Sequence, residues 1–245
     1  EYLSCCILNK YLNSQKVYLK NIELIDSLDI IKSNMNNNDG YYNKGEFEVN
    51  KEILIENLKD NKALIIPGFS GSTPNGKICL LGRGGSDTSG SIIATSLKAK
   101  SYQIWTDVDG LYNCDPKVTS DAKIIDRIGY QMAQEMAAMG AKVLHPYSIL
   151  PCAKENIPII IKNTFNHNNN STIINGCNSK NKIYAITQQK NVSIFKITSL
   201  NMWNNYGFVH DIFSYFKKYN IDVNLISTSQ FNITTTTDDT DLEKL

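Results

Sequence analysis

The chain has 245 residues, 42% of them hydrophobic, which is enough apolar material to bury the core of one large domain or two smaller ones. Its 25 basic and 24 acidic residues give a net charge of +1, so no broad field attracts nucleic acid or an anionic membrane. No run approaches the roughly 20 apolar residues that cross a bilayer. We therefore expect a soluble protein with small-molecule partners.

The six cysteines form no C-x-x-C pair, and no histidine lies at zinc-ligand spacing from any of them. This pattern predicts a reducing, intracellular compartment and no metal bound by the protein itself. The chain begins with Glu1 rather than methionine, so these residues do not test whether a targeting segment precedes them. The cytoplasm and the plastid stroma both remain open.

Strand-like and helix-like segments alternate through the first two thirds of the chain. The strand-like runs are residues 63–67, 101–106 and 157–162, and the helix-like stretches are residues 86–100 and 130–144. This alternation predicts an α/β fold with a mostly parallel sheet. Within it, GSTPNGK at residues 71–77 nearly matches a phosphate loop, but Ile78 replaces the required Ser or Thr and a strand follows. We predict a β-turn there instead.

The segment LGRGGSDTSG at residues 81–90 joins a strand-like run to a helix with apolar periodicity. Gly84 and Gly85 allow a tight turn, and a helix beginning near Ser86 directs free backbone N–H groups into that turn. Arg83 adds a planar cation that suits a carboxylate or phosphate. The pattern indicates an anion site, with a plain glycine turn as the alternative.

The segment WTDVDGLYNCDPK at residues 105–117 follows a strand, the position where open α/β sheets bind ligands. Its three aspartates lack the spacing of a calcium loop, so an ordinary acidic turn is the alternative. In GAKVLHP at residues 140–146, Lys142 ends a predicted helix and His145 follows it. Taken alone, Lys142 fits a surface lysine and His145 a packed or capping histidine.

A second unit follows residue 175, where the composition becomes polar. Its predicted elements are a strand at residues 192–198, a helix at 207–219 and strands at 223–228 and 231–236. The order predicts an α+β domain. Residues 237–245 are polar and charged and show no closing strand, so we expect this domain to be truncated.

Taken in order, EYLS, GFSG, LGRGGSD, WTDVDGLY, DPK and EMAAMGAKVLHP resemble the aspartate kinases of the amino-acid kinase family. LGRGGSD together with AKVLHP separates these enzymes from the uridylate, glutamate and acetylglutamate kinases. Residues 199–229 resemble the first ACT regulatory domain of the aspartate kinases, so the resemblance covers nearly all of the chain.

The resemblance implies a three-layer amino-acid kinase fold with a mostly parallel central sheet at residues 1–178, and a partial, ferredoxin-like ACT domain at residues 190–245. It also implies transfer of the γ-phosphate of ATP, with Mg²⁺, to the side-chain carboxylate of L-aspartate. The product, 4-phospho-L-aspartate, is the first intermediate of lysine, threonine and methionine biosynthesis.

The resemblance also implies roles at matching positions of the substrate site. Glu1 would hold the substrate ammonium and Arg83 its α-carboxylate, and the site would be lined by Phe69, Gly84, Gly85 and Ser86. Asp87 would organise the phosphoryl-transfer centre.

On the nucleotide side, the resemblance assigns ATP contacts to Thr106, Asp107 and Tyr112. Lys142 and the backbone of Val143 would reach the phosphates, which makes Lys142 the second catalytic candidate. Lys117 stands where the family usually carries arginine, so the charge is kept while a bidentate contact is lost.

The family's K-F-G-G-T-S loop, whose lysine stabilises the transferred phosphoryl group, is absent from these 245 residues. We therefore expect this chain alone not to turn over. The alternative is a catalytically inactive chain that serves as an amino-acid-sensing ACT module. A following homoserine dehydrogenase domain is also left open.

The ACT resemblance implies that lysine or threonine binds between paired domains of two chains, and hence at least a homodimer. The matching effector positions are Met202, Gly207, Phe208, Val209, Val223, Asn224 and Ser229. Asn224 stands where lysine-sensitive relatives commonly carry Asp, and Gln230 replaces a Glu. Lysine, threonine and no effector therefore all remain open.

Overall fold

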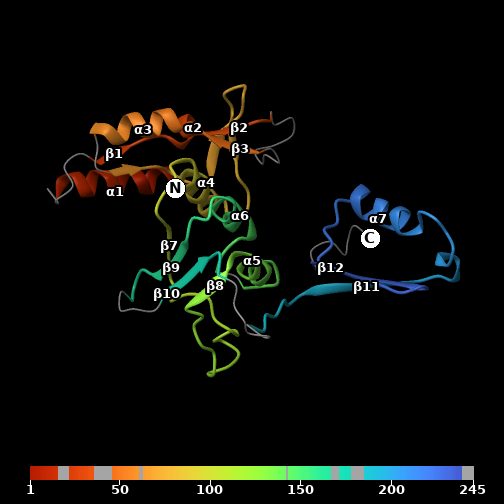
Figure 1. Ribbon diagram of the computed structural model, residues 1–245. Helices are drawn as coiled ribbons and strands as arrows, with labels where there is room; N and C mark the ends of the chain where they lie inside the picture. Colours follow the sequence, from red (N-terminus) through yellow and green to blue (C-terminus); the bar gives the residue numbers. More distant parts are fainter. Residues whose placement is uncertain are drawn as a thin grey trace. The chain divides into compact units, whose positions relative to one another are not determined.

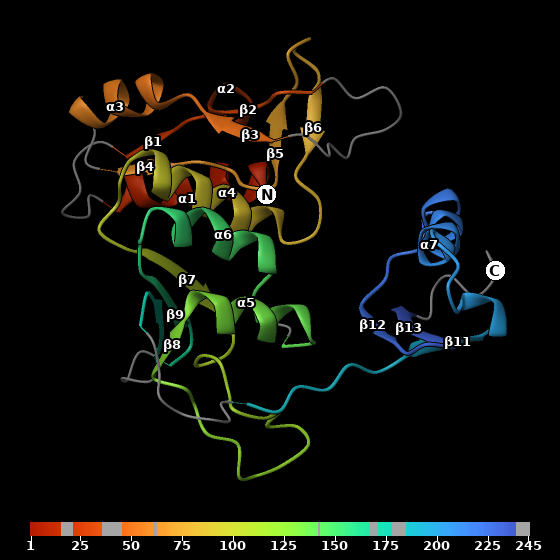
Figure 2. The same cartoon turned by 45° about the vertical axis from the view of Figure 1, so that its right-hand side comes forward.

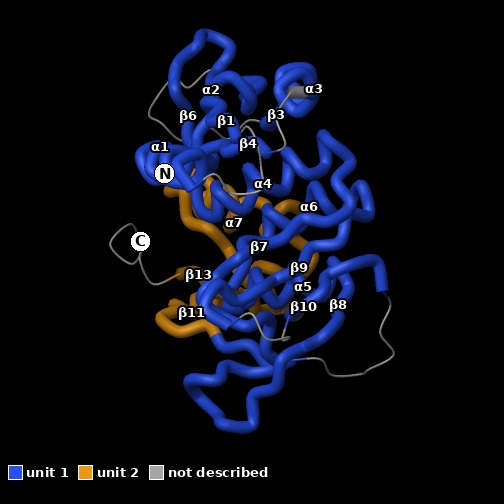
Figure 3. The backbone as a smooth tube through the Cα atoms, turned by 90° about the vertical axis from the view of Figure 1, so that its left-hand side faces the viewer, with its two compact units in different colours: residues 1–188 blue, residues 189–245 orange. Residues whose placement is uncertain are grey.

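The computed structural model describes residues 1–15, 22–35, 46–60, 63–141, 143–166, 171–177 and 185–238. The chain divides into two compact units, unit 1 (Glu1–Gln188) and unit 2 (Gln189–Leu245), which Figure 3 distinguishes by colour. Within the described ranges, no helix is long and apolar enough to span a membrane.

The first part of unit 1 builds two small sheets around α4. Its elements are α1 (Tyr2–Ser14), β1 (Ile22–Leu24), α2 (Ser27–Ile30), β2 (Ile31–Ser33), β3 (Phe47–Val49), α3 (Lys51–Asp60), β4 (Ala63–Ile65), β5 (Ser70–Ser72), β6 (Ile78–Leu80) and α4 (Gly85–Ser96). Strand β1 pairs with β4, and the other four form the order β3-β2-β5-β6. Ile30, Ile31 and Leu54 are fully buried in the core of this part.

The second part of unit 1 is a four-stranded sheet with two helices on one face (Figures 1 and 2). Its elements are β7 (Tyr102–Thr106), β8 (Arg127–Gly129), α5 (Tyr130–Ala138), α6 (Pro146–Lys154), β9 (Ile159–Asn163) and β10 (Ser171–Asn175). The strand order is β7-β9-β10-β8. Strand residues such as Ile161 and Ile174 pack with Met136 of α5 and Ile149 of α6 in one core cluster.

The sheets of unit 1 are mixed, which differs from the expected mostly parallel sheet. Among the described strands, the pairs β1–β4, β2–β5, β7–β9 and β8–β10 are parallel, whereas β2–β3, β5–β6 and β9–β10 are antiparallel. Parallel neighbours need a crossover of about a dozen residues or more. The link from β9 to β10, residues 164–170, is shorter than that, so the chain turns back.

The predicted β-turn between β5 and β6 is confirmed. The Gly76 N–H donates to the Thr73 carbonyl over 2.9 Å, and the Lys77 carbonyl accepts from the Thr73 N–H over 2.9 Å. Gly76 has φ = 73°, the conformation that closes such a hairpin. GSTPNGK therefore forms a tight turn and no phosphate loop.

Two predicted helices end earlier than the sequence pattern indicates. Helix α5 stops at Ala138 rather than residue 144, because Gly140 takes φ = 106° and the Ala141 N–H bonds back to the Met136 carbonyl. Helix α4 stops at Ser96 rather than residue 100, and here Lys98 occupies the left-handed position with φ = 50°. A glycine in the sequence predicts that a helix ends in the left-handed conformation, whereas a lysine does not.

Unit 2 is an antiparallel sheet with one helix packed on it. Its elements are β11 (Val192–Thr198), the 3-10 helix η1 (Leu200–Met202), α7 (Phe208–Lys218), β12 (Leu225–Thr228) and β13 (Asn232–Asp238), and the strand order is β11-β13-β12. The Phe195 ring meets the buried Phe216 ring of α7 edge-on, with centroids 6.1 Å apart. The predicted order of strand, helix, strand and strand is confirmed.

Candidate functional site

The glycine-rich turn after β6 leads directly into α4, as the sequence predicts. Gly84 takes φ = 66° as the N-cap, and no side chain caps the helix. The first backbone N–H groups of α4 therefore lack side-chain acceptors at the cap position, and they carry the partial positive charge of a helix N-terminus. A carboxylate or phosphate placed at this turn would be stabilised.

A carboxylate already reaches this turn from the start of the chain. Glu1 is the N-cap of α1, and its carboxylate accepts a hydrogen bond from the Ser86 hydroxyl. Gly68, in the segment between β4 and β5, leaves room for both groups, since a Cβ there would lie 3.0 Å from Glu1 Oε2. Three segments distant in sequence thus meet at one point.

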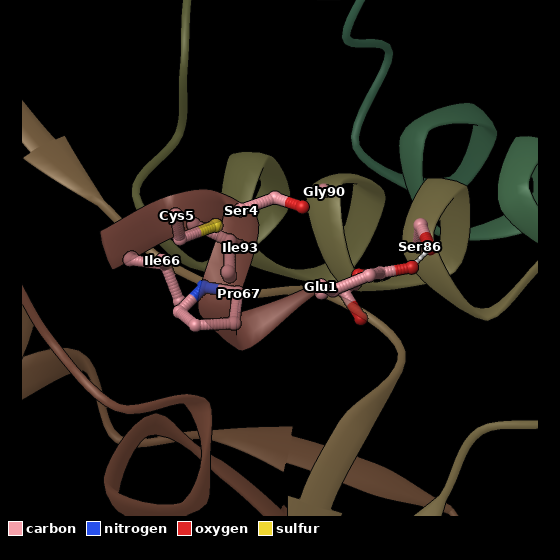
Figure 4. Close-up of a pocket in the computed structure, with 10 residues that line it drawn as sticks. Glu1, Ser4, Cys5, Ile66, Pro67, Ser86, Gly90 and Ile93 are labelled. Atoms are coloured by element: carbon pink, nitrogen blue, oxygen red, sulfur yellow. Dashed lines mark hydrogen bonds between the residues drawn. The ribbon is translucent and has the colours of Figure 1, made fainter. Parts of the chain in front are cut away.

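A pocket of about 420 Å³ opens beside this contact. Figure 4 shows the Glu1 carboxylate directed toward Ser86, with Cys5, Ile66 and Pro67 grouped at the other end. The lining residues are Glu1, Ser4, Cys5, Ile66, Pro67, Gly68, Ser86, Ser89, Gly90 and Ile93. The pocket therefore has a polar end at the α4 N-terminus and a mostly apolar end beside Ile66 and Pro67.

Arg83 and His145 bring the start of α6 to the same turn. His145 is the N-cap of α6, and its ring nitrogen Nδ1 accepts from the Tyr147 N–H over 3.4 Å. Burial, followed by the charge of Arg83, lowers the pKa of His145. His145 is thus a capping histidine, and Arg83 supplies the positive charge at the turn.

Phe69 and Asp87 complete the surroundings of the turn. Phe69 takes φ = 72°, a strained conformation for a non-glycine residue, and its N–H donates to Ser89 Oγ over 3.0 Å. Its ring lies so close to Gly85 that a Cβ there would be 2.8 Å from Phe69 Cδ2. Burial, followed by the charge of Glu1, raises the pKa of Asp87 in the first turn of α4.

A second polar group lies at the carboxyl end of β7. The Thr106 hydroxyl donates to Asp107 Oδ1 over 3.1 Å, and Asn163 Nδ2 donates to Asp109 Oδ1 over 2.7 Å. Burial, followed by the charge of Asp109 and a hydrogen bond with it, raises the pKa of Tyr112. Asn163 was missed by sequence reasoning, although it ends β9, the parallel neighbour of β7.

The remaining predicted site residues of unit 1 are Lys117, Val143 and Lys142. Lys117 is exposed in a turn where its N–H donates to Asp115 Oδ1 over 2.9 Å. The Val143 side chain packs against the core of the second sheet. Lys142 lies outside the described residues.

The predicted effector positions of unit 2 lie at both ends of its sheet. Met202 and the first turn of α7, with Gly207, Phe208 and Val209, follow the end of β11, and the Ser199 N–H donates to the Phe231 carbonyl beside Ser229. Asn224 precedes β12, and its amide Nδ2 donates to Asp238 Oδ1 over 2.9 Å at the other end. Five strand steps of about 3.3 Å put Asn224 and Ser229 about 16 Å apart.

The chain matches known families and structures over most of its length. The model of the amino acid kinase family matches residues 1–163. The lysine-sensitive aspartokinase 3 of Escherichia coli is 39% identical over 184 residues, which cover 74% of this chain and 40% of that protein. The chloroplastic aspartokinase 3 of Arabidopsis thaliana is 35% identical over 193 residues, covering 78% of this chain and 34% of that one.

Solved structures of E. coli aspartokinase III resemble the chain in both of its described states. The structure with aspartate and ADP, the R-state, has a TM-score of 0.81 at 30% identity and covers 97% of this chain. The structure with lysine and aspartate, the T-state, has a TM-score of 0.78 at 30% identity and covers 98%. The chain spans 53% and 54% of those two structures, about half of their length.

Proposed function

Because the chain belongs to the amino acid kinase family and is homologous to the aspartokinases over most of its length, we propose that it is the part of an aspartate kinase that holds aspartate and ATP. The reaction would transfer the γ-phosphate of ATP to the side-chain carboxylate of L-aspartate. It would form 4-phospho-L-aspartate, the first step toward lysine, threonine and methionine.

The observation that carries this proposal is the meeting of Glu1 and Ser86 beside Gly68 at the N-terminus of α4, with Arg83 directly before that helix. A zwitterionic amino acid needs an anion for its ammonium and a cation for its α-carboxylate. Glu1 would supply the first and Arg83 the second. Phe69, Gly84, Gly85 and Ser86 would line the site, and the hydrogen bond from Ser86 already orients the Glu1 carboxylate.

The chemistry suits this arrangement because the substrate carboxylate is ionised at neutral pH and needs no strong base. The protein must instead hold several anions close together and neutralise them. Helix N-termini and Lys142 would serve that purpose, and Asp87 would organise the transfer centre. The raised pKa of Asp87 shows how strongly its charge depends on the groups around it.

On the nucleotide side, we assign ATP contacts to Thr106, Asp107 and Tyr112, with the Val143 backbone and Lys117 nearer the phosphates. Among the described residues, no group of three or more His, Cys, Asp and Glu side chains would hold a metal ion. We propose that Mg²⁺ arrives with the nucleotide, because kinases bind it through one or two carboxylates and the phosphates. When bound, Mg²⁺ would neutralise phosphate charge.

The test is aspartate-dependent ADP release by the complete gene product, with hydroxylamine trapping of the acyl phosphate. Arg83→Ala should lower kcat/KM for aspartate by about 10- to 150-fold, the equivalent of one hydrogen bond to a charged group. The control is Arg127→Ala, because Arg127 is exposed in β8. Equal values for the two variants would contradict the assignment of Arg83.

The second candidate is a catalytically inactive chain that senses an amino acid. It is favoured by unit 2, whose antiparallel sheet with one helix could serve as a binding module by itself. We also propose that the 245-residue chain alone does not turn over. If the complete gene product releases no ADP with aspartate, this candidate replaces the kinase. For the kinase and for the inactive chain alike, we propose that the protein is in the cytoplasm or the plastid stroma.

We propose that residues 190–245 belong to an ACT regulatory domain and residues 1–178 to the catalytic domain. Unit 2 supports this with its order of strand, helix, strand and strand. The effector positions lie at opposite ends of one sheet, so a second chain would be needed to bring Asn224 beside Met202, Gly207, Phe208, Val209 and Ser229. A homodimer paired through unit 2 would meet that need.

The effector is proposed to be lysine or threonine. One aspartokinase structure similar to this chain contains lysine. Here Asn224 offers an amide, which already donates to Asp238, and Val223 beside it offers no charge. Titration calorimetry of the complete gene product with each amino acid decides between them, and no heat with lysine would remove lysine.

A further inference from the structure

Tyr102, the first residue of β7, contacts the first turns of α4. Its hydroxyl donates to the Asp87 carbonyl over 3.0 Å. Its own N–H donates to the Pro158 carbonyl over 2.8 Å, which fixes the tyrosine at the edge of the sheet. Tyr102 thus connects the strand that leads to Thr106 with the helix that carries Asp87.

The Tyr102 ring lies against the backbone of α4 at Gly90. A Cβ at Gly90 would be 2.5 Å from the Tyr102 hydroxyl oxygen and 2.7 Å from Cε2, so a side chain there would displace the tyrosine ring. Glycine inside a helix is about 1 kcal/mol less favourable than alanine. Gly90 therefore weakens α4 locally, and the close approach of the tyrosine is the compensating contact.

The hydroxyl remains a donor over the physiological pH range. Burial, followed by the charges of Asp87 and Cys152, raises the pKa of Tyr102, so its hydroxyl does not ionise near neutrality. A helix carbonyl has two lone pairs and accepts this bond in addition to its own helix bond. The contact thus adds to the helix without competing with it.

The first turn of α4 has no capping side chain, and its contacts from outside the helix come from Glu1, Phe69 and His145 as well as from Tyr102. Its N-cap is Gly84, and Gly85 follows. The Thr88 and Ser89 hydroxyls donate hydrogen bonds to the carbonyls of Gly84 and Gly85, and both bonds lie within α4 and its N-cap. Tyr102 differs from the other neighbours outside the helix because its hydroxyl bonds to the backbone of Asp87 itself.

We propose that Tyr102 is a positioning residue for Asp87, because its hydroxyl and ring hold the first turn of α4 against β7. The importance of Asp87 for phosphoryl transfer rests on the proposed function. The contact between Tyr102 and α4, and its effect on Asp87, do not rest on the proposed function, because they follow from the geometry alone.

The test uses NMR on the 245-residue chain with Tyr102→Phe, which removes the hydroxyl and keeps the ring. Exchange of the α4 amides from Thr88 onward, the first of which donates to the Gly84 carbonyl over 2.9 Å, should accelerate about 2- to 10-fold, the equivalent of one hydrogen bond. The titration midpoint of the Asp87 carboxyl should fall toward the ordinary aspartate value, because the freed turn exposes it to water. Gly90→Ala, which displaces the ring and keeps the hydroxyl, should have the same two effects.

The matched control is Tyr130→Phe, because the Tyr130 hydroxyl is also buried but has no hydrogen-bond partner among the described residues. It should leave the Asp87 midpoint unchanged and should not accelerate amide exchange in α4. An unchanged Asp87 midpoint with unchanged exchange in Tyr102→Phe overturns the proposal. Equal acceleration in α5 and β9 also overturns it, since that result reports a general loss of stability.

Kinetics of the complete gene product separate this proposal from the function. Tyr102→Phe should lower kcat by about 10-fold while the KM for aspartate stays nearly constant, because misplacement affects the transfer step. A changed KM with an unchanged kcat would contradict positioning of Asp87. If the wild type shows no activity, the proposed function fails, and the NMR result still decides the role of Tyr102.

Discussion

Replacing Gly84 by alanine tests how closely the start of α4 packs on the start of α6. Gly84 has φ = 66°, and an added Cβ would lie 2.2 Å from His145 Cβ and 2.6 Å from its Cγ. The left-handed conformation costs an alanine about 1–2 kcal/mol. Forcing atoms into an occupied space costs about 1–3 kcal/mol more. We expect Gly84→Ala to lower the free energy of unfolding by about 2–5 kcal/mol.

Gly76→Ala is the matched control, because Gly76 has φ = 73° and no atom within 4 Å of its added Cβ. This variant meets only the conformational cost of about 1–2 kcal/mol. Both substitutions restrict the unfolded chain equally, so that effect cancels in their difference. The difference between the variants, about 1–3 kcal/mol, measures the packing of Gly84 on His145.

The assay is urea unfolding followed by tryptophan fluorescence. The chain has two tryptophans, Trp105 in unit 1 and Trp203 in unit 2, so a Trp203→Phe background leaves Trp105 as the reporter of unit 1. Equal losses in Gly84→Ala and Gly76→Ala would refute the reasoning, because they would show that His145 moves away at no cost.

Three further predictions concern single side chains of unit 1. Asp87→Asn should raise the urea midpoint at pH 7, because the raised pKa of Asp87 means that its ionised form destabilises the fold. The difference from wild type should shrink as the pH falls below the raised pKa and vanish below the ordinary aspartate pKa. Tyr130→Phe should stabilise the chain by about 1 kcal/mol in the same assay, because it removes a buried hydroxyl that has no partner among the described residues. Asp26→Ala should cost about 1 kcal/mol in thermal unfolding, because Asp26 caps α2 by accepting from the Leu28 N–H over 2.9 Å.

Local features of the fold follow from the sequence because their causes are local. The proline, asparagine and glycine at residues 74–76 require a turn, and the turn is there. The glycines before Ser86 predict a helix start, and α4 begins at Gly85. Unit 2 keeps its predicted element order because its strands and helix show their own periodicity.

The sequence did not predict the features that depend on which other segment of the chain packs beside a strand or helix. The sheets are mixed, and two of the antiparallel pairs, β5–β6 and β9–β10, are joined by links too short for a parallel crossover. Lys98 follows the end of α4 in the left-handed conformation, which a lysine in the sequence does not predict. Asn163 is an ordinary strand-end residue until β9 lies beside β7 and brings it to Asp109. None of these pairings is visible in a single stretch of sequence.

The sequence by itself determined the family resemblance, the glycine turn and the residue types suited to holding anions. Only the tertiary structure decided that Glu1 reaches Ser86, 85 residues away, and that Tyr102 reaches Asp87. Periodicity and turn chemistry encode hydrogen bonds between near neighbours in the chain. A contact between distant residues depends instead on which surfaces bury one another, and that is settled only when the whole unit packs.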